Sequence, residues 1–240
     1  MCIKIAHIAD LHLDESNLFE NESVARKHFD IILKDIERRN ISQVVCTGDI
    51  GENEGVEYFF EQLKNKKLSV TLGNHDDFLI ISKYYSSGTD SDSKKIYQTT
   101  LGKFYKYIYL DSSEGIIDKK QLLWLERELM TSLPIIIFVH HPILGLDLKV
   151  DDIGKLANQN EVINILTSSS NSITVYCGHY HMESHKAYKN IKQLITPAVS
   201  FQIEKNIDTI EINTDVFGYR IIELFVHGMR SEVIMFNDAN

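Results

Sequence analysis

Five short apolar runs constrain the fold of this chain most, because each one ends in polar residues of the kinds that bind metals or substrates. These runs are Ile3 to Ala9 before Asp10-Leu11-His12, Val44 to Thr47 before Gly48-Asp49, Leu68 to Leu72 before Gly73-Asn74-His75-Asp76, Ile135 to Val139 before His140-His141, and Ile173 to Cys177 before Gly178-His179-Tyr180-His181. Apolar runs of this length are typical of buried strands in a parallel sheet. Ligands bind at the carboxyl ends of such strands, so the polar residues are predicted to meet at one edge.

Helical patterns between the runs complete the prediction of an α/β fold. Residues Asn21 to Arg39 and Gly55 to Lys66 have apolar residues at helical spacing, and the β-α-β-α-β order predicts parallel strands. Residues Ser86 to Ser93 are polar and are interpreted as a mobile surface loop. Residues 191–236 contain short alternating runs that predict a second, mainly antiparallel sheet. At 240 residues and 43% hydrophobic content, one domain covering residues 1–240 is expected.

Composition restricts the classes of partner and location. The formal net charge is -9, and no run of Lys or Arg is longer than a pair, which argues against a nucleic-acid polymer as partner. Cys2, Cys46 and Cys177 are widely spaced beside apolar runs and are interpreted as reduced core residues. No signal peptide or membrane span is visible, so we expect a cytoplasmic protein without a membrane partner.

The polar residues after the runs form a set that suits transition metals. The candidate ligands are four histidines, two aspartates and an asparagine: Asp10, His12, Asp49, Asn74, His140, His179 and His181. This mixture of nitrogen and oxygen donors suits Zn, Mn, Fe or Co better than Ca or Mg. Seven ligands are too many for one such ion, whereas a carboxylate shared by two ions about 3.5 to 4 Å apart accounts for the number.

The ordered series resembles a known family. Asp10-x-His12, Gly48-Asp49, Gly73-Asn74-His75-Asp76, His140 and Gly178-His179-x-His181 are similar to the five blocks of the calcineurin-like metallophosphoesterases. Trp124-Leu125-Glu126, His140-His141-Pro142 and Thr196-Pro197 resemble the class III cyclic-nucleotide phosphodiesterase branch, which more often has a second proline where Ile143 stands. The resemblance implies a four-layer αββα sandwich of two mixed sheets flanked by helices.

The resemblance also implies a role for each site residue. Asp10, His12 and His181 would bind the first metal, Asn74, His140 and His179 the second, and Asp49 would bridge them. The ions would be Mn, Fe or Zn, and a hydroxide between them would be the nucleophile. His75 would donate a proton to the departing oxygen as general acid. The substrate phosphate would be contacted by Asn74, His75, His12, Asp49 and His181.

These roles predict hydrolysis of a small phosphate ester by a monomer or homodimer. The first hypothesis is a 3',5'-cyclic nucleotide such as cyclic AMP, cleaved to the 5'-monophosphate. Alternatives are a broad phosphodiesterase or phosphomonoesterase acting on glycerophosphodiesters or nucleotides, a non-catalytic scaffold, and a DNA nuclease, which the acidic charge disfavours. The sequence leaves open whether Asp76 fixes its loop or orients His75, and whether Tyr180 faces substrate or packs beneath the metals. His141 is interpreted as a packing or supporting residue.

Overall fold

The first of two large sheets combines parallel and antiparallel strands. The structure, a computed structural model, describes residues 2–15, 23–205 and 209–238. The order of the first sheet is β15-β14-β1-β2-β3, with β1 at Ile3–Ile8, β2 at Gln43–Cys46, β3 at Lys67–Val70, β14 at Val216–Phe225 and β15 at Gly228–Asn237. Strands β1, β2 and β3 are parallel, as predicted, whereas β14 and β15 are antiparallel to their neighbours.

The second sheet is also mixed. Its order is β10-β11-β9-β8-β7-β6, with β6 at Gln98–Leu101, β7 at Lys106–Tyr109, β8 at Ile135–Phe138, β9 at Ile173–Cys177, β10 at Ser184–Tyr188 and β11 at Ile191–Ile195. The four inner strands are parallel, and the two edge strands β6 and β10 are antiparallel. Buried side chains from both sheets, including Ile5, Val45, Phe138 and Tyr176, pack in one cluster between them. The two sheets therefore face each other.

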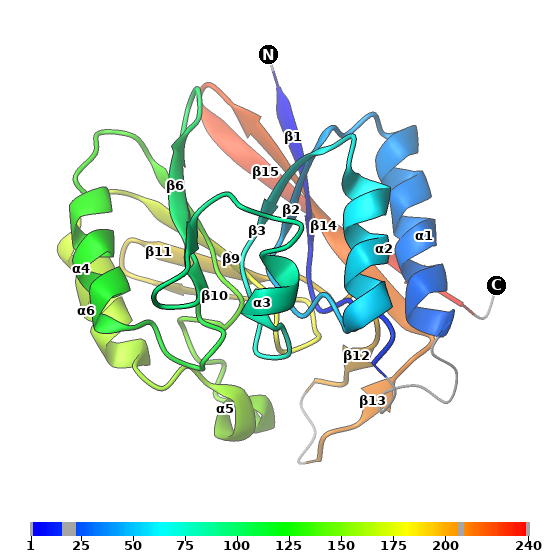
Figure 1. Ribbon diagram of the computed structural model, residues 1–240. Helices are drawn as coiled ribbons and strands as arrows, with labels where there is room; N and C mark the ends of the chain where they lie inside the picture. The colour runs from blue at the N-terminus through cyan, green and yellow to red at the C-terminus, as the bar shows by residue number, and fades with distance from the viewer. Residues whose placement is uncertain (1, 16–22, 206–208, 239–240) are drawn as a thin grey trace.

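Helices cover the outer face of each sheet, as the apolar stripes of the sequence predict. Helices α1 (Ser23–Arg38) and α2 (Asn53–Leu63) pack on the first sheet, and α4 (Lys119–Glu128) and α6 (Gln159–Ser168) pack on the second. Figure 1 shows the two helix pairs on opposite sides of the sheets. The predicted four-layer αββα sandwich of two mixed sheets is confirmed.

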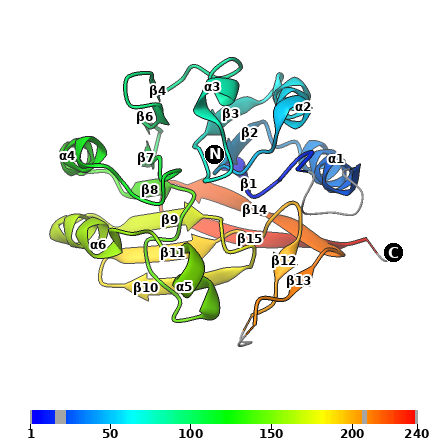
Figure 2. The ribbon, with the colours of Figure 1, turned by 60° about the horizontal axis from the view of Figure 1, so that its bottom comes forward.

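Short elements surround the carboxyl ends of the parallel strands. They are α3 (Phe78–Ile81), α5 (Lys149–Gly154), β12 (Gln202–Ile203) and β13 (Ile212–Asn213). Helix α5 and strands β12 and β13 lie at the lower end of the molecule in Figure 1 and come forward in Figure 2. The sequence patterns did not predict α5. Helix α5 matters for the site, because a Cβ on Gly154 would come within 2.5 Å of Nε2 of His179.

Two expectations from the sequence are wrong. The antiparallel runs near the C-terminus do not form a sheet of their own: β14 pairs with β1, and β11 pairs parallel with β9, because both sheets offered a free edge to pair with. The run Ile207 to Ile212 lies partly outside the described residues. Cys2 is exposed, whereas Cys46 and Cys177 are buried as expected.

The mobility expected for residues Ser86 to Ser93 stays a prediction. Within this segment β4 (Thr89–Asp90) pairs with β5 (Lys95–Ile96), and Asp90 forms an ion pair with Lys120.

Candidate metal centre

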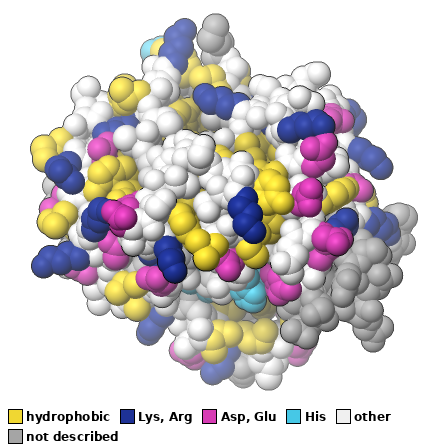
Figure 3. All heavy atoms as spheres, in the orientation of Figure 1, with side chains coloured by type: hydrophobic (Ala, Val, Ile, Leu, Met, Phe, Trp, Pro, Cys, Tyr) yellow, Lys and Arg dark blue, Asp and Glu magenta, His cyan; other side chains and the backbone are white. Residues whose placement is uncertain are grey.

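The polar residues that follow the five apolar runs meet at one end of the two sheets. Those after β1, β2 and β3 come from the first sheet, and those after β8 and β9 come from the second. A direct contact joins the two sets: the backbone N–H of His179 donates to both carboxylate oxygens of Asp10, at 2.9 and 3.0 Å. In Figure 3, histidine side chains reach the surface at the lower part of the molecule. The edge predicted from the sequence is therefore built from both sheets.

The backbone at this edge has an unusual conformation. Five of the candidate ligands have positive φ angles: Asp10 (54°), His12 (48°), Asp49 (52°), His179 (70°) and His181 (48°). Non-glycine residues rarely adopt this left-handed region, and such strain concentrates at functional sites. All five residues lie in the loops directly after β1, β2 and β9.

Glycines allow the ligand loops to approach each other closely. A Cβ on Gly73 would lie 2.1 Å from Oδ1 of Asp49, and a Cβ on Gly178 would lie 2.6 Å from Oδ2 of Asp10. Contacts this short are not possible for a side chain, so glycine is required beside each carboxylate. The glycines that precede Asn74 and His179 in the sequence therefore make room for aspartates that are distant in the chain.

Asp10, His12 and His181 form one cluster of possible ligands, all buried. Their ligand atoms lie within 4.8 Å of one another. The Nε2 atoms of His12 and His181 are 3.1 Å apart, and Nε2 of His181 is 3.9 Å from Oδ1 of Asp10. This cluster contains the residues that the resemblance assigned to the first metal.

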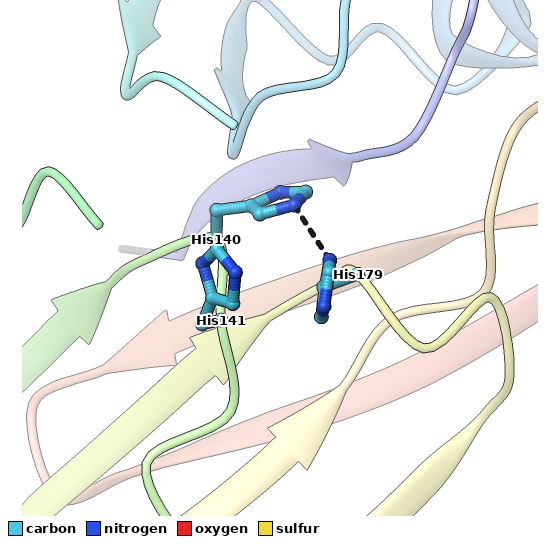
Figure 4. Close-up of side chains that lie close together, drawn as sticks. All are labelled: His140, His141 and His179. Carbon is cyan, nitrogen blue, oxygen red and sulfur yellow. Dashed lines mark hydrogen bonds between the residues drawn. The ribbon is translucent and has the colours of Figure 1, made fainter. Parts of the chain in front are cut away.

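His140, Asn74 and His179 form the neighbouring cluster. Nε2 of His140 lies 3.0 Å from Oδ1 of Asn74 and 3.1 Å from Nδ1 of His179, the contact drawn in Figure 4. Asp49 lies between the two clusters, since its Oδ2 is 3.3 Å from Nε2 of His140 and 3.7 Å from Nε2 of His12. The structure thus brings all seven candidate ligands together, with Asp49 at the centre.

Hydrogen bonds fix the orientation of the four histidine rings. Acceptors lie beside the second nitrogen of each ring: Oε1 of Glu15 for His12 (2.9 Å), the Thr47 carbonyl for His140 (2.8 Å), the Phe201 carbonyl for His181 (3.1 Å) and the backbone of Gly154 for His179. A neutral imidazole that donates from one nitrogen presents a lone pair on the other. The lone pairs of paired rings then face each other at 3.1 Å and repel unless a cation lies between them. The donor set therefore fits transition-metal ions.

The charges of the site shift the pKa values of its members. Burial alone would raise the pKa of Asp49, but the neighbouring His140 and His12 outweigh it and hold this pKa well below its usual value. Burial opposes protonation of His140, yet the carboxylate of Asp49 raises the pKa of this histidine to about 9. The site carboxylates likewise raise the pKa of His12 against burial, whereas burial lowers the pKa of His179 and of His181.

His75 lies at the outer rim of the clusters. Its side chain is 46% exposed, its backbone N–H donates to Oδ1 of Asp49 at 2.9 Å, and its Nδ1 is 3.2 Å from Oε2 of Glu15. The hydrogen bond to Glu15 is the main cause that raises the pKa of His75 to about 9, against the effect of burial. The Glu15 contact thus favours the protonated form of His75, and the exposure of the ring leaves it open to a substrate.

Asp76 fixes its loop instead of contacting His75. Its carboxylate accepts from the backbone N–H groups of Asp49, Ile50 and Gly73, all at 2.8 Å. Tyr180 is 1% exposed and its hydroxyl donates to Asp151, so it packs beneath the cluster and does not face a substrate. These contacts resolve two questions that the sequence left open.

His141 and Glu15 complete the surroundings of the clusters. His141 is buried, its Nδ1 is 2.9 Å from Oγ of Ser112, and its ring lies 4.1 Å from that of His179. One of its ring nitrogens falls within 4.8 Å of ligand atoms of His140 and His179, so His141 is a possible further ligand. Glu15 was not predicted as a site residue. Its only signal in the sequence is a carboxylate three residues after His12.

Comparison with known proteins identifies the family. The family model for the calcineurin-like phosphoesterases matches residues 3–183, which include every block of the series above. The chain belongs to the calcineurin-like phosphoesterase family. Members of this family use a dinuclear metal centre, and the chain is accordingly a metal-dependent phosphoester hydrolase.

Two similar relatives are both named as phosphodiesterases of cyclic nucleotides. A probable cyclic nucleotide phosphodiesterase of Fibrobacter succinogenes is 25% identical, over 98% of this chain and 94% of its own length. A 3',5'-cyclic adenosine monophosphate phosphodiesterase of Haemophilus influenzae is 27% identical, over 96% of this chain and 89% of its own. Both alignments run over nearly the whole of each chain.

The fold is also similar to solved structures. A dimetal phosphatase from Danio rerio superposes with a TM-score of 0.70 at 14% sequence identity, covering 98% of both chains. Among the helices of the described residues, none is both long and apolar enough to cross a bilayer.

Proposed function

We propose that this phosphoesterase hydrolyses 3',5'-cyclic nucleotides, such as cyclic AMP, to nucleoside 5'-monophosphates. The observation that carries the proposal is the position of His75, a half-exposed imidazole whose backbone N–H donates to the central carboxylate Asp49 and whose Nδ1 lies 3.2 Å from Oε2 of Glu15. Cleavage of a cyclic phosphodiester expels a sugar alkoxide, which needs a proton as it leaves. The names of the relatives support the choice of cyclic nucleotides among diesters.

Two transition-metal ions, Mn, Fe or Zn, would occupy the centre. Asp10, His12 and His181 would hold one ion and Asn74, His140 and His179 the other, with Asp49 shared between them. Such ions, when bound, polarise phosphoryl oxygens and lower the pKa of water toward neutrality. The hydrogen bonds on the outer nitrogens of the histidines support this assignment, because they keep the inner nitrogens free to bind.

The residues of the chain would then position the phosphate and supply the proton. Asn74 and His75 are exposed, so their side chains are the ones best placed to contact the substrate phosphate directly. His12, Asp49 and His181 are buried, and their contact with substrate would be limited to the floor of the site. As the bond between phosphorus and the sugar oxygen breaks, the ring of His75 would transfer its proton to that oxygen.

A panel of four substrates tests the proposal. A chelator removes any bound metal from the protein, and Mn²⁺ is then added. The protein is assayed with cyclic AMP, bis-p-nitrophenyl phosphate, glycerophosphocholine and single-stranded DNA. We expect kcat/KM for cyclic AMP to exceed that for each of the others by about tenfold or more, which corresponds to about 1.4 kcal/mol of transition-state stabilisation.

The other outcomes decide between the alternatives. Equal rates on cyclic AMP and the generic nitrophenyl ester would contradict the cyclic-nucleotide assignment and favour a broad phosphodiesterase, for which the exposure of Asn74 and His75 would be the structural reason. Preferential cleavage of DNA would contradict the proposal outright.

A further inference from the structure

Glu15 connects the proposed proton donor to a proposed metal ligand. One of its carboxylate oxygens, Oε1, accepts from Nδ1 of His12 at 2.9 Å, and the other, Oε2, accepts from Nδ1 of His75 at 3.2 Å. The Glu15 side chain is only 8% exposed. A buried carboxylate is costly unless its oxygens are paired, and here both oxygens are used.

The conformation of the loop after β1 brings Glu15 back to the site. His12 and Asp14 both have positive φ angles, 48° and 62°, and the backbone N–H of Glu15 returns to the His12 carbonyl at 3.4 Å. The loop is held from the other side, where the backbone N–H of Leu13 donates to the Ile50 carbonyl at 2.9 Å. The position of Glu15 is therefore set by the same backbone that sets His12.

Resting on the function proposed above, we propose that Glu15 is the positioning residue for His75. Its carboxylate holds the Nδ1–H of the ring, so that Nε2 is the nitrogen that faces the leaving oxygen of the substrate. The rings of His75 and His12 meet edge to face, with centroids 4.8 Å apart and an angle of 87°. Because one carboxylate binds both rings, it fixes the proton donor relative to the metal-binding histidine.

The chemistry of the two contacts requires a carboxylate. A carboxylate accepts hydrogen bonds with both of its oxygens, whereas the amide of glutamine accepts with one and donates with the other. Glu15→Gln keeps the size of the side chain but presents an N–H group to one of the two ring N–H groups. His75 is the more exposed ring and has fewer contacts than His12, so it is the ring expected to lose its position.

Four variants test this role: Glu15→Gln, His75→Ala, the double variant, and the control Asp14→Asn. Asp14 is adjacent in sequence and has the same charge, but its carboxylate binds Arg26, with Oδ1 2.7 Å from Nε. Asparagine also tolerates the positive φ of this position. Each Mn²⁺-loaded variant is assayed with cyclic AMP, whose leaving group is an alkoxide, and with bis-p-nitrophenyl phosphate, whose leaving group needs no proton. Metal content is measured for each.

We expect Glu15→Gln to lower kcat for cyclic AMP by about 10- to 100-fold, the usual effect of removing a partner that orients a site residue. The kcat for the nitrophenyl ester should change less than about threefold, and metal content should equal that of Asp14→Asn. On the His75→Ala background, Glu15→Gln should cause no further loss, because its effect passes through His75.

A structural measurement complements the assays. In protein loaded with diamagnetic Zn²⁺, long-range ¹H–¹⁵N spectra, assigned by comparison with His75→Ala, report the protonation of each ring nitrogen of His75. We expect both nitrogens to carry a proton at neutral pH in the wild type and in Asp14→Asn, with Nδ1–H bonded to Glu15 and Nε2–H available to the substrate, and a change at this ring in Glu15→Gln.

Specific results would overturn the inference. If His75→Ala lowers turnover of cyclic AMP selectively but Glu15→Gln does not, the role of Glu15 is wrong while the proposed function stands. If His75→Ala shows no such selectivity, the role of His75 as proton donor fails and the role of Glu15 fails with it, while the substrate panel decides separately on the proposed function. A fall in metal content in Glu15→Gln would also overturn the inference. It would mean that Glu15 acts through His12 or binds a cation itself, since ligand atoms of His12, Glu15 and His75 lie close together.

Discussion

Single residues of the candidate metal centre differ sharply in exposure, and this difference separates the proposed metal ligands from the proposed proton donor. Asp10 and His140 are fully buried, whereas the His75 side chain is 46% exposed. His75 touches the clusters through its backbone, through Glu15 and through the edge-to-face contact of its ring with that of His12. Its loss should therefore leave the ligand set intact.

His75→Ala should retain both metals and lose turnover selectively. Removing a general acid costs about 10² to 10⁴ in rate when the leaving group needs a proton. We expect a loss of this size in kcat for cyclic AMP and little change for bis-p-nitrophenyl phosphate, measured beside metal analysis. His227→Ala, an exposed histidine in the turn between β14 and β15, is the matched control. A fall in metal content would show that His75 is a ligand and not the proton donor.

The sequence predicted that the seven candidate ligands would lie together, but not all of the contacts around them. The order of the five blocks was sufficient because parallel strands deliver their carboxyl ends to one edge. Glu15 could not be predicted, because its approach to His75 depends on two left-handed residues, His12 and Asp14, that local patterns do not reveal. Asp76 was recognised as a candidate, but its three backbone partners include two from a loop 26 and 27 residues away.

Individual elements are held in place by a few charged contacts outside the site. Asp35 of α1 is buried and accepts from the hydroxyl of Tyr219 on β14 at 2.7 Å and from Nε of Arg39 at 2.6 Å. Burial raises the pKa of Asp35, but the hydrogen bonds from Arg38, Tyr219 and Arg39 outweigh it and lower the pKa below the usual value. This network fastens the first helix to the first sheet.

Asp35→Asn should destabilise the fold in a pH-dependent way. We expect the free energy of unfolding at pH 7 to fall by about 2 kcal/mol, the usual worth of hydrogen bonds to a charged group. A carboxyl whose folded pKa is lowered stabilises above its unfolded pKa, and the effect is lost as pH falls through the folded pKa. The difference from wild type should therefore shrink on acidification below about pH 4. Urea unfolding at several pH values measures this.

Glu37→Gln provides the control for Asp35→Asn, because Glu37 is an exposed residue of the same helix. A destabilisation by Asp35→Asn that is equal at all pH values would show that the network acts through packing and not through charge.

The sequence predicted the helices and inner strands, but only some of the pairings between strands. The helices and the inner strands follow from apolar periodicity, since that pattern is local. The pairing of β14 with β1 joins Ile5 to Ile222, and nothing in either local pattern selects one free sheet edge over another. Helix α5 was missed because its six residues are too few for a periodic signal, although Gly154 within it contacts His179.

The whole molecule is required to assemble the site. Asp10 and His179 are 169 residues apart in the chain and belong to different sheets, yet they are joined by hydrogen bonds of 2.9 and 3.0 Å. Packing of the two sheets therefore determines whether the clusters around Asp49 form at all. With a formal net charge of -9, the chain also depends on bound cations for the positive field that a phosphate ester needs.

The central claim is that two metal ions lie on either side of Asp49. Diffraction from crystals grown with Mn²⁺, recorded at the manganese absorption edge, tests it most directly. We expect two anomalous peaks about 3.5 to 4 Å apart. One should lie beside Asp10, His12 and His181, and the other beside Asn74, His140 and His179. A single peak, or none among these side chains, would contradict it.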